Sequence, residues 1–191
     1  MNSQCFDLKI GYISKLRQET ANKVLKLKSL ITPDKISFPL ETLISKLFDL
    51  GGIISGGAAL SLLNNKPIRD IDFYFNNDNS YVEAANLVGF NRKIDVCWYF
   101  NNPMELHDIS YVMCTLNRNG VYITEAAQEA FDTGISELYL NHIIYPNRTA
   151  QRMLKYNDRY NCKFKLAQVL AFISIFNIER QIANKLLTIS I

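Results

Sequence analysis

The sequence predicts an α/β (α+β) fold, with a small mixed β-sheet, flanking helices, an N-terminal helical segment and a short C-terminal helical extension. Three observations predict it. Apolar residues recur at helical spacing near both ends of the chain, short apolar strands occupy the middle, and a Gly-Gly turn joins one strand to a helix. We expect an N-terminal helical segment over residues 1–50, a core over 51–145 and a C-terminal extension over 146–191.

The N-terminal segment predicts two helices. Apolar side chains in residues 7–31 fall near helical spacing, with Lys or Arg between them. Thr32-Pro33-Asp34 ends this helix. A second helix is expected over about residues 39–50, before Gly51-Gly52.

The core predicts strands and helices in alternation, followed by a hairpin. A strand at 52–54 runs into Ser55-Gly56-Gly57, and a helix at 58–63 leaves this turn. The elements expected next are a strand at 70–75, a helix at 81–88, a strand at 93–100, and two strands at 108–116 and 121–124. Asn119-Gly120 between the last two strands is a strong hairpin signal. The extension is then helical, over 147–160 and from 165 to about 187.

Composition limits the class of protein. The chain has 191 residues, of which 48% are hydrophobic and 20% charged, as in an ordinary globular protein. It has no apolar run of about 18 residues that would cross a membrane and no secretory signal pattern at its N-terminus. Its four cysteines form no Cys-x-x-Cys pair, so we expect reduced thiols in a cytoplasmic protein with no membrane partner.

Charge is distributed unevenly behind a net charge of +3. Residues 38–145 hold six basic and thirteen acidic groups, whereas residues 146–165 hold six basic groups and one acidic group. An acidic centre beside a basic segment suits a metal site that also holds a polyanion.

Two carboxylates share one face of the strand predicted at 70–75. Residues i and i+2 of a strand point to the same side, so Asp70 and Asp72 lie together while the apolar residues between and after them face the core. Asp95 alternates with Ile94 and Val96 in the same way. If the two strands pair side by side, the three carboxylates form an oxygen-ligand site of the kind that Mg²⁺ requires, and one of them can bridge two ions.

The Ser55-Gly56-Gly57 turn is a candidate phosphate cradle. Glycines let the backbone approach a phosphate closely, and the helix that follows offers N–H groups and a positive dipole end. A Gly-Gly turn alone is more often structural, and a lone Asp-x-Asp is often an exposed edge. The ordered set of strand, turn, helix, Asp-Ile-Asp and Ile-Asp-Val favours a functional site.

With these motifs the chain resembles the polymerase-beta-type nucleotidyltransferase superfamily, at residues 54–60 (Ile-Ser-Gly-Gly-Ala-Ala-Leu) and 70–73 (Asp-Ile-Asp-Phe). It is more closely similar to the head domain of CCA-adding enzymes and bacterial poly(A) polymerases, and to small phage or viral nucleotidyltransferase-like proteins. Residues 107–112 and 145–152 are similar to two later segments of the CCA-adding group, and residues 148–156 to the phage-type proteins.

This resemblance implies a nucleotidyltransferase fold with its catalytic core at 51–145. It also implies two Mg²⁺ ions, a nucleoside triphosphate such as ATP, and transfer of a nucleotidyl group with release of pyrophosphate. His107 stands where the family has an arginine, and the family's Asn near Val112 is absent, so the choice of base is not carried over. We expect no counterpart of the downstream tRNA-binding domains, because about 30 residues follow Tyr160.

A basic stripe follows from the helix predicted at 147–160. At 100° per residue, cations spaced +4, +3 and +4 share one narrow face. These cations are Arg148, Arg152, Lys155 and Arg159. A neighbouring stripe packs on the core and consists of Thr149, Met153, Tyr156 and Tyr160. The cations hold a triphosphate or a nucleic-acid backbone, or they form a solvated face; the resemblance and the absence of acids from the stripe favour binding.

Three further residues have more than one interpretation. Asp108 is a fourth metal ligand, a substitute for Asp95 or a strand-end cap. Lys66 and Arg69 flank the acidic pair and either contact phosphate or pair with the two carboxylates. Neither histidine is expected to act as a general base, because metal-bound carboxylates can activate the attacking hydroxyl.

The expected function is magnesium-dependent transfer of a nucleotidyl group to an RNA (tRNA-like), protein or small-molecule acceptor. The expected roles are Asp70 and Asp72 for two Mg²⁺ ions, Asp95 for hydroxyl activation, Ser55, Gly56 and Gly57 for the β- and γ-phosphates, and Arg148, Arg152 and Lys155 for charge neutralisation. Two alternatives stay open: a non-catalytic adaptor, inhibitor or sensor that binds nucleotide or nucleic acid, and a toxin-like enzyme that modifies tRNA or a protein. For a phage or viral protein, the place of action is the host cytoplasm.

Overall fold

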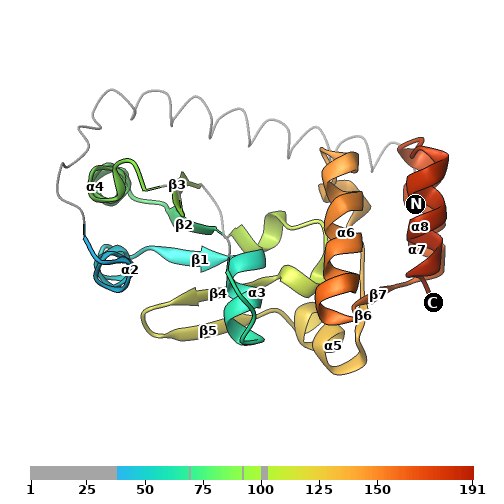
Figure 1. Ribbon diagram of the computed structural model, residues 1–191, viewed down its shortest axis with the longest axis horizontal. Coiled ribbons are helices and arrows are strands. Elements are labelled where there is room, and N and C mark those ends of the chain that lie inside the picture. The colour runs from blue at the N-terminus through green and yellow to red at the C-terminus, as the bar shows by residue number, and fades with distance from the viewer. Residues whose placement is uncertain (1–37, 69, 92, 100–102) are drawn as a thin grey trace. The chain divides into compact units, whose positions relative to one another are not determined.

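The computed structural model describes residues 38–191 except 69, 92 and 100–102 (Figure 1). These residues form two compact units. The sheet unit comprises the described residues up to Glu105 together with Cys114–Tyr122, and the helical unit comprises Leu106–Met113 and Ile123–Ile191. The helix predicted at 7–31 lies outside the described residues, and the region boundaries predicted after residues 50 and 145 stay a prediction.

The sheet unit contains a mixed five-stranded sheet of order β3-β2-β1-β4-β5. Its strands are β1 (Ile53–Ser55), β2 (Ile71–Phe75), β3 (Ile94–Trp98), β4 (Cys114–Asn117) and β5 (Gly120–Ile123). β1 pairs antiparallel with β2 and β4, whereas β2 and β3 are parallel. The predicted mixed sheet is therefore confirmed. So is the Asn-Gly hairpin, in which the Asn117 side chain accepts hydrogen bonds from the backbone of Asn119 and Gly120.

Helices cover the apolar face of β2 and β3. These helices are α2 (Leu40–Asp49) and α4 (Asp78–Val88), whereas α3 (Gly57–Leu63) packs against β1 and β4. Every second residue of β2 is buried, because strand side chains alternate between faces. The ring of Phe48 in α2 lies 5.1 Å from that of Phe73, and Trp98 Nε1 donates a hydrogen bond of 3.1 Å to Asp78 at the start of α4. The opposite face of these two strands is left for polar side chains.

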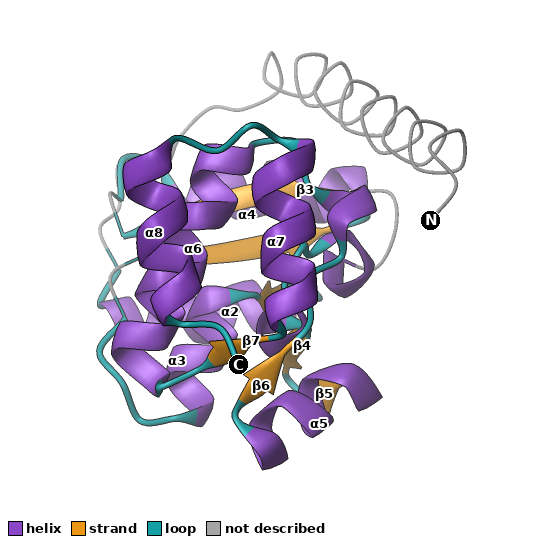
Figure 2. Cartoon of the chain, turned by 90° about the vertical axis from the view of Figure 1, so that its right-hand side faces the viewer, coloured by secondary structure: helices purple, strands orange, loops and turns teal. Residues whose placement is uncertain are grey.

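Helices make up most of the helical unit (Figure 2). They are α5 (Glu125–Thr133), α6 (Pro146–Tyr160), α7 (Leu166–Ile175) and α8 (Arg180–Thr188). Two short parallel strands, β6 (Ile135–Ser136) and β7 (Lys163–Phe164), and the 3₁₀ helices η2 (Ser110–Val112) and η3 (Leu140–His142) complete it. A further 3₁₀ helix is η1 (Pro103–Leu106). Among the described residues, no helix has the length and apolar character needed to span a membrane.

Helix α6 buries one stripe of its surface, as its spacing predicts. Pro146 occupies a first-turn position, where its missing N–H costs nothing, and Asn161 ends the helix in the left-handed conformation with φ 55°. The buried side chains are Thr149, Ala150, Met153 and Tyr156. Because these follow helical spacing, the cations between them lie on a different face.

Three predicted elements are corrected. The strand predicted at 108–116 begins only at Cys114, because Asp108 and Ser110 hydrogen-bond with residues 137–139 and Ser110–Val112 forms η2. The helix predicted from 165 to 187 is two helices, α7 and α8, with Asn177 at φ 48° between them. The strand predicted to include Asp70 starts one residue later, at Ile71.

Candidate active site

Three carboxylates, Asp70, Asp72 and Asp95, form what we call the carboxylate face of the sheet unit. Asp72 lies on β2 between buried residues, and Asp95 is its register partner on the parallel strand β3. Neighbouring strands lie about 4.8 Å apart, so these two side chains are adjacent. Asp70 directly precedes β2 and has the same parity as Asp72. The structure therefore brings together the three carboxylates that the sequence predicted.

The pKa of Asp72 is raised by its surroundings on this face. Burial raises the pKa of Asp72 above its ordinary value, and the negative charges of Asp95 and Asp70 raise it further. Asp72 is half-buried, whereas Asp70 and Asp95 are exposed. A cation would relieve this repulsion, since an opposite charge favours the ionised form.

The donor chemistry of the carboxylate face fits a hard divalent cation. Carboxylate oxygens are the ligands that Mg²⁺ takes in proteins. Among the described residues, no three His, Cys, Asp or Glu side chains already lie in a metal-binding arrangement. Asp70, Asp72 and Asp95 are the residues of this face that would hold such an ion.

Cys97 lies on the same face of β3, two residues after Asp95. Burial and the charges of Asp72 and Asp95 raise the pKa of this thiol to about 12. The side chain is therefore a neutral thiol at physiological pH. Cys97, Cys114 and Cys162 are free thiols in the described part of the chain.

The glycine turn joins β1 to α3 as the sequence predicted. Gly56 has φ 69° and ψ −136°, which L side chains rarely adopt. Its N–H donates to the Cys114 carbonyl at 3.3 Å, and the buried Ser55 hydroxyl donates to the same carbonyl at 3.3 Å. These bonds fix the turn against β4. The predicted contacts of Ser55, Gly56 and Gly57 with phosphate stay a prediction.

Two basic residues were predicted beside the acidic pair. Lys66 is exposed in the loop after α3, and its backbone N–H donates to the Ser61 carbonyl at 2.8 Å. Arg69 lies outside the described residues. A role in phosphate binding stays a prediction for both.

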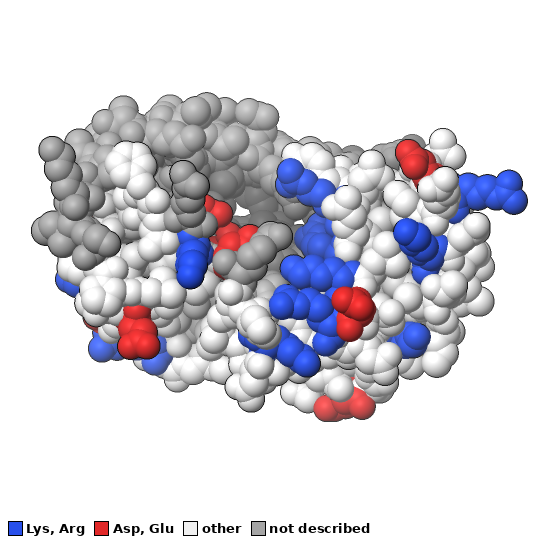
Figure 3. All heavy atoms as spheres, in the orientation of Figure 1, with Lys and Arg blue, Asp and Glu red and all other residues white. Residues whose placement is uncertain are grey.

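The cations of α6 form a basic stripe in the helical unit, defined by Arg148, Arg152, Lys155 and Arg159. Figure 3 shows Lys and Arg side chains gathered on the face where Figure 1 draws α6. The Arg148 guanidinium lies over the exposed ring of Tyr145, 5.2 Å from its centroid, and Lys155 Nζ lies 5.9 Å from the centroid of Tyr156. Aromatic contacts of this kind hold cations without neutralising them.

Asp108 belongs to the helical unit and contacts α6. Its side chain is 4% exposed, and its Oδ2 accepts hydrogen bonds from the Thr149 hydroxyl and from Arg152 Nη2, the latter at 2.8 Å. Its Oδ1 is buried and has no hydrogen-bond partner among the described residues. Sequence reasoning placed Thr149 in the core but missed its bond to Asp108, because the two residues are 41 positions apart and no local pattern links them.

Solved structures with the same fold are CCA-adding enzymes. The structure of a CCA-adding enzyme with ATP gives a TM-score of 0.56 at 13% identity, over 75% of this chain and 43% of that chain. A CCA-adding enzyme with CTP gives 0.55 at 15% identity, over 85% and 48%. The Thermotoga maritima CCA-adding enzyme complexed with tRNA gives 0.51 at 13% identity, over 69% and 40%. These likenesses confirm the predicted nucleotidyltransferase fold, although the chain spans less than half the length of each.

Family membership follows from a separate comparison. The model of the family described as Gabija anti-defense 2 family protein matches residues 34–133, which include the glycine turn and the carboxylate face. A comparison with curated proteins finds no match. Because the family match covers more than half of the chain, the protein belongs to this family.

Proposed function

We propose that this Gabija anti-defense 2 family protein is a magnesium-dependent nucleotidyltransferase. The observation that carries the proposal is the register of β2 and β3, which sets Asp72 beside Asp95 in a nucleotidyltransferase fold. The raised pKa of Asp72 supports it, because three carboxylates on one face are costly unless a cation neutralises them. A protein that kept the fold only as a scaffold would have no need for this arrangement.

In the proposed reaction, an acceptor hydroxyl oxygen attacks the α-phosphorus of a nucleoside triphosphate. The bond from this phosphorus to the oxygen that bridges to the β-phosphate breaks, and pyrophosphate leaves. Asp95 accepts the hydroxyl proton. Asp70 and Asp72, with Asp95, would hold the Mg²⁺ ions, which when bound supply Lewis-acid stabilisation of the phosphate charge.

The triphosphate requires donors as well as carboxylates. We propose that Gly56 and Gly57 offer backbone N–H groups to it, since a turn without side chains permits close approach. For the helical unit by itself, we propose that Arg148, Arg152 and Lys155 bind phosphate charge, because guanidinium and ammonium groups match phosphate oxygens. Lys66 and Arg69 are proposed as further phosphate contacts.

The acceptor is proposed to be an RNA, a protein side chain or a small molecule. One solved neighbour is a CCA-adding enzyme complexed with tRNA, which supports an RNA acceptor. The family description names an action against the Gabija defence, which supports an acceptor within that system and the cytoplasm of an infected cell as the place of action.

A label-transfer assay tests the proposal. The protein is incubated with Mg²⁺, each α-labelled nucleoside triphosphate, and either total RNA or lysate from cells that carry the Gabija system. We expect label in one acceptor class, and a loss of at least about a hundredfold in the Asp70→Asn/Asp72→Asn variant. The control is Glu41→Gln/Glu83→Gln, which removes two charges from exposed positions on α2 and α4 and should leave transfer unchanged.

A second candidate function is non-catalytic inhibition through nucleotide or nucleic-acid binding. The family description favours it, because it names an anti-defense role and no chemistry. The same variant separates the two. If Asp70→Asn/Asp72→Asn still counteracts the Gabija system and no acceptor is labelled by the unsubstituted protein, the catalytic proposal is wrong.

A further inference from the structure

We propose that Asp108 is a positioning residue, which holds the guanidinium of Arg152 so that its outer edge binds the phosphates of a polyanion. This proposal rests on the proposed function, because it uses a phosphate chain as the ligand of the basic stripe. It assigns Asp108 a task other than metal binding. Four observations support it: hydrogen bonds fix the backbone of Asp108, its carboxylate reaches α6, one part of the Arg152 guanidinium stays accessible, and burial of the Asp108 charge has a cost.

The backbone around Asp108 is fixed by long-range hydrogen bonds. The Asp108 carbonyl accepts from the N–H of Tyr139 at 2.9 Å, and Ile109 forms an isolated antiparallel bridge with Leu138. On the other side, His142 Nδ1 lies within hydrogen-bond distance, 2.9 Å, of the His107 carbonyl. Asp108 is therefore held from both neighbouring residues.

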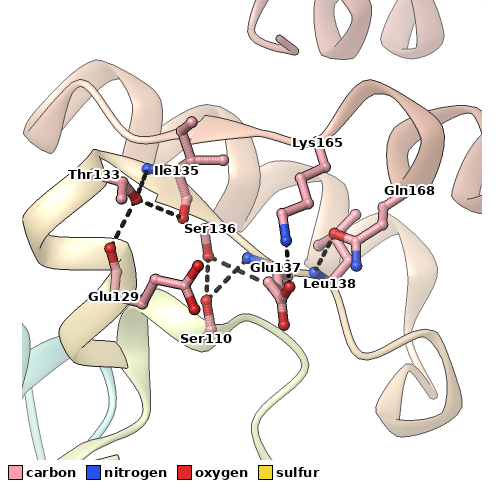
Figure 4. A network of polar contacts seen from close by, with 9 residues as sticks. All are labelled: Ser110, Glu129, Thr133, Ile135, Ser136, Glu137, Leu138, Lys165 and Gln168. Carbon is pink, nitrogen blue, oxygen red and sulfur yellow. Dashed lines mark hydrogen bonds and ion pairs between the residues drawn. The ribbon is translucent and has the colours of Figure 1, made fainter. Parts of the chain in front are cut away.

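The segment that holds Asp108 is itself part of a polar network (Figure 4). The hydroxyl of Ser110 lies 3.0 Å from that of Ser136 and accepts from the N–H of Glu137 at 2.9 Å. Glu137 forms an ion pair with Lys165, and the N–H of Leu138 donates to the Gln168 side chain at 3.0 Å. Figure 4 shows these side chains converging from η2, β6 and α7. These bonds tie the segment that follows Asp108 to β6 and to the start of α7.

The carboxylate then reaches α6 through a single oxygen. Asp108 Oδ2 accepts from the hydroxyl of Thr149, which is fully buried, and from Nη2 of Arg152, one helical turn further on. Nη2 also lies 3.5 Å from Thr149 Oγ1. The three groups fix the inner edge of the guanidinium plane.

The outer part of Arg152 stays accessible. Its side chain is 37% exposed, and its Nε donates to the Arg148 carbonyl at 3.4 Å. Among the residues that the structure describes, Nη1 has no hydrogen-bond partner. A guanidinium presents five N–H donors in a rigid fork, so one held edge leaves the other oriented for phosphate oxygens.

The charge of Asp108 is not needed for a purely structural bond. An asparagine oxygen could accept from Thr149 and Arg152 without a buried charge. Burying a carboxylate whose Oδ1 has no partner among the described residues is costly. An ionised acceptor forms a stronger and more directional bond with a guanidinium than a neutral one does. The cost is accounted for if Asp108 serves to orient Arg152.

Inorganic tripolyphosphate tests this inference, with affinity measured by calorimetry between about 50 and 200 mM KCl. Asp108→Asn makes the protein more positive by one charge, so simple electrostatics predicts tighter binding. Positioning predicts the opposite sign: about tenfold weaker binding, the loss expected when a charged hydrogen bond is weakened. The matched control is Asp158→Asn, which removes an exposed charge from α6, the helix that carries Arg152. This variant should bind as tightly as the unsubstituted protein or more tightly.

Two further variants make the result decisive. In an Arg152→Ala background, Asp108→Asn should cause no additional loss, because the effect passes through Arg152. Arg152→Lys keeps the charge at a partly exposed position but loses the fork, so it should also weaken binding. Equal or tighter binding by Asp108→Asn, or unchanged binding by Arg152→Lys, would overturn the inference.

The result is separable from that of the proposed function. If the unsubstituted protein shows no salt-sensitive binding of tripolyphosphate, the inference on Asp108 is wrong, while label transfer by the carboxylate face is decided by its own assay. If transfer is absent but binding has the expected pattern, Asp108 still positions Arg152 in a binding protein.

Discussion

At the scale of single residues, Gly52 directly precedes β1 and lies very close to α2 and to two rings of β2. A Cβ added to Gly52 would lie 2.7 Å from the Leu47 carbonyl oxygen, 2.7 Å from Phe75 Cζ and 2.9 Å from Phe73 Cδ1. Both rings are held in the core, so neither can move away cheaply. The position therefore requires glycine for space, whatever its backbone angles.

We predict that Gly52→Ala lowers the free energy of unfolding by about 1–3 kcal/mol, as overpacking does. Urea denaturation followed by far-UV circular dichroism measures it. Gly51→Ala is the control: it has φ +82° but nothing within 4 Å of the added atom, so only backbone strain of about 1–2 kcal/mol opposes it. Stability unchanged by Gly52→Ala would contradict the close approach.

Asp72 carries a pH-dependent cost. Its pKa is raised in the folded protein above the ordinary value of 3.8, first by burial and then by Asp95 and Asp70. The folded state thus binds the proton more tightly than the unfolded state, and stability falls as pH rises from 3.8 through the raised pKa. Above that pKa the full cost is present, and below 3.8 it is absent.

We therefore predict that Asp72→Asn stabilises the metal-free protein at pH 7, by about 1 kcal/mol or less because the group is partly solvated. The gain should shrink as pH falls toward 3.8. Urea denaturation in EDTA at several pH values measures it. A gain that is constant with pH would show that the charge of Asp72 is not its source.

At the scale of elements, local pattern predicts the site better than it predicts the helical unit. The alternation in 70–75 and 94–96 and the Gly-Gly turn are short-range signals, and β1, β2, β3 and α3 follow them closely. The two-residue strands β6 and β7 carry no periodicity. Asp108 lies outside β4 because its segment hydrogen-bonds with residues about 30 positions further along the chain, and no local sequence window contains both.

The end of α6 gives a prediction at this scale. Asn161 adopts φ 55°, its N–H donates to the Asn157 carbonyl, and the N–H of Cys162 donates to the Tyr156 carbonyl. Alanine tolerates this conformation poorly, so Asn161→Ala should cost about 1 kcal/mol, whereas Asn161→Gly should be close to neutral. Thermal denaturation of both variants measures the difference. Equal melting temperatures would show that the left-handed cap contributes little.

At the scale of the whole molecule, the division into two units separates two kinds of chemistry. The carboxylate face belongs to the sheet unit, and the basic stripe belongs to the helical unit. Each unit has buried apolar side chains of its own, such as Phe73 in the sheet unit and Phe172 in the helical unit. We therefore expect two thermal unfolding transitions, which a single melting temperature would average. A ligand that binds one unit shifts the transition of that unit first.

Mg²⁺ binding to the sheet unit can be tested through thermal unfolding, without an activity assay. Binding to the folded state alone stabilises by RT ln(1 + [L]/Kd), so about ten times Kd adds about 1.4 kcal/mol and raises the transition by a few degrees. We predict that calorimetry shows this rise for the transition of the sheet unit. Asp70→Asn/Asp72→Asn should abolish it, and Glu41→Gln/Glu83→Gln should retain it. A rise of the same size in the Asp70→Asn/Asp72→Asn variant would place Mg²⁺ elsewhere, because the carboxylate face would then have lost two of its three charges without consequence.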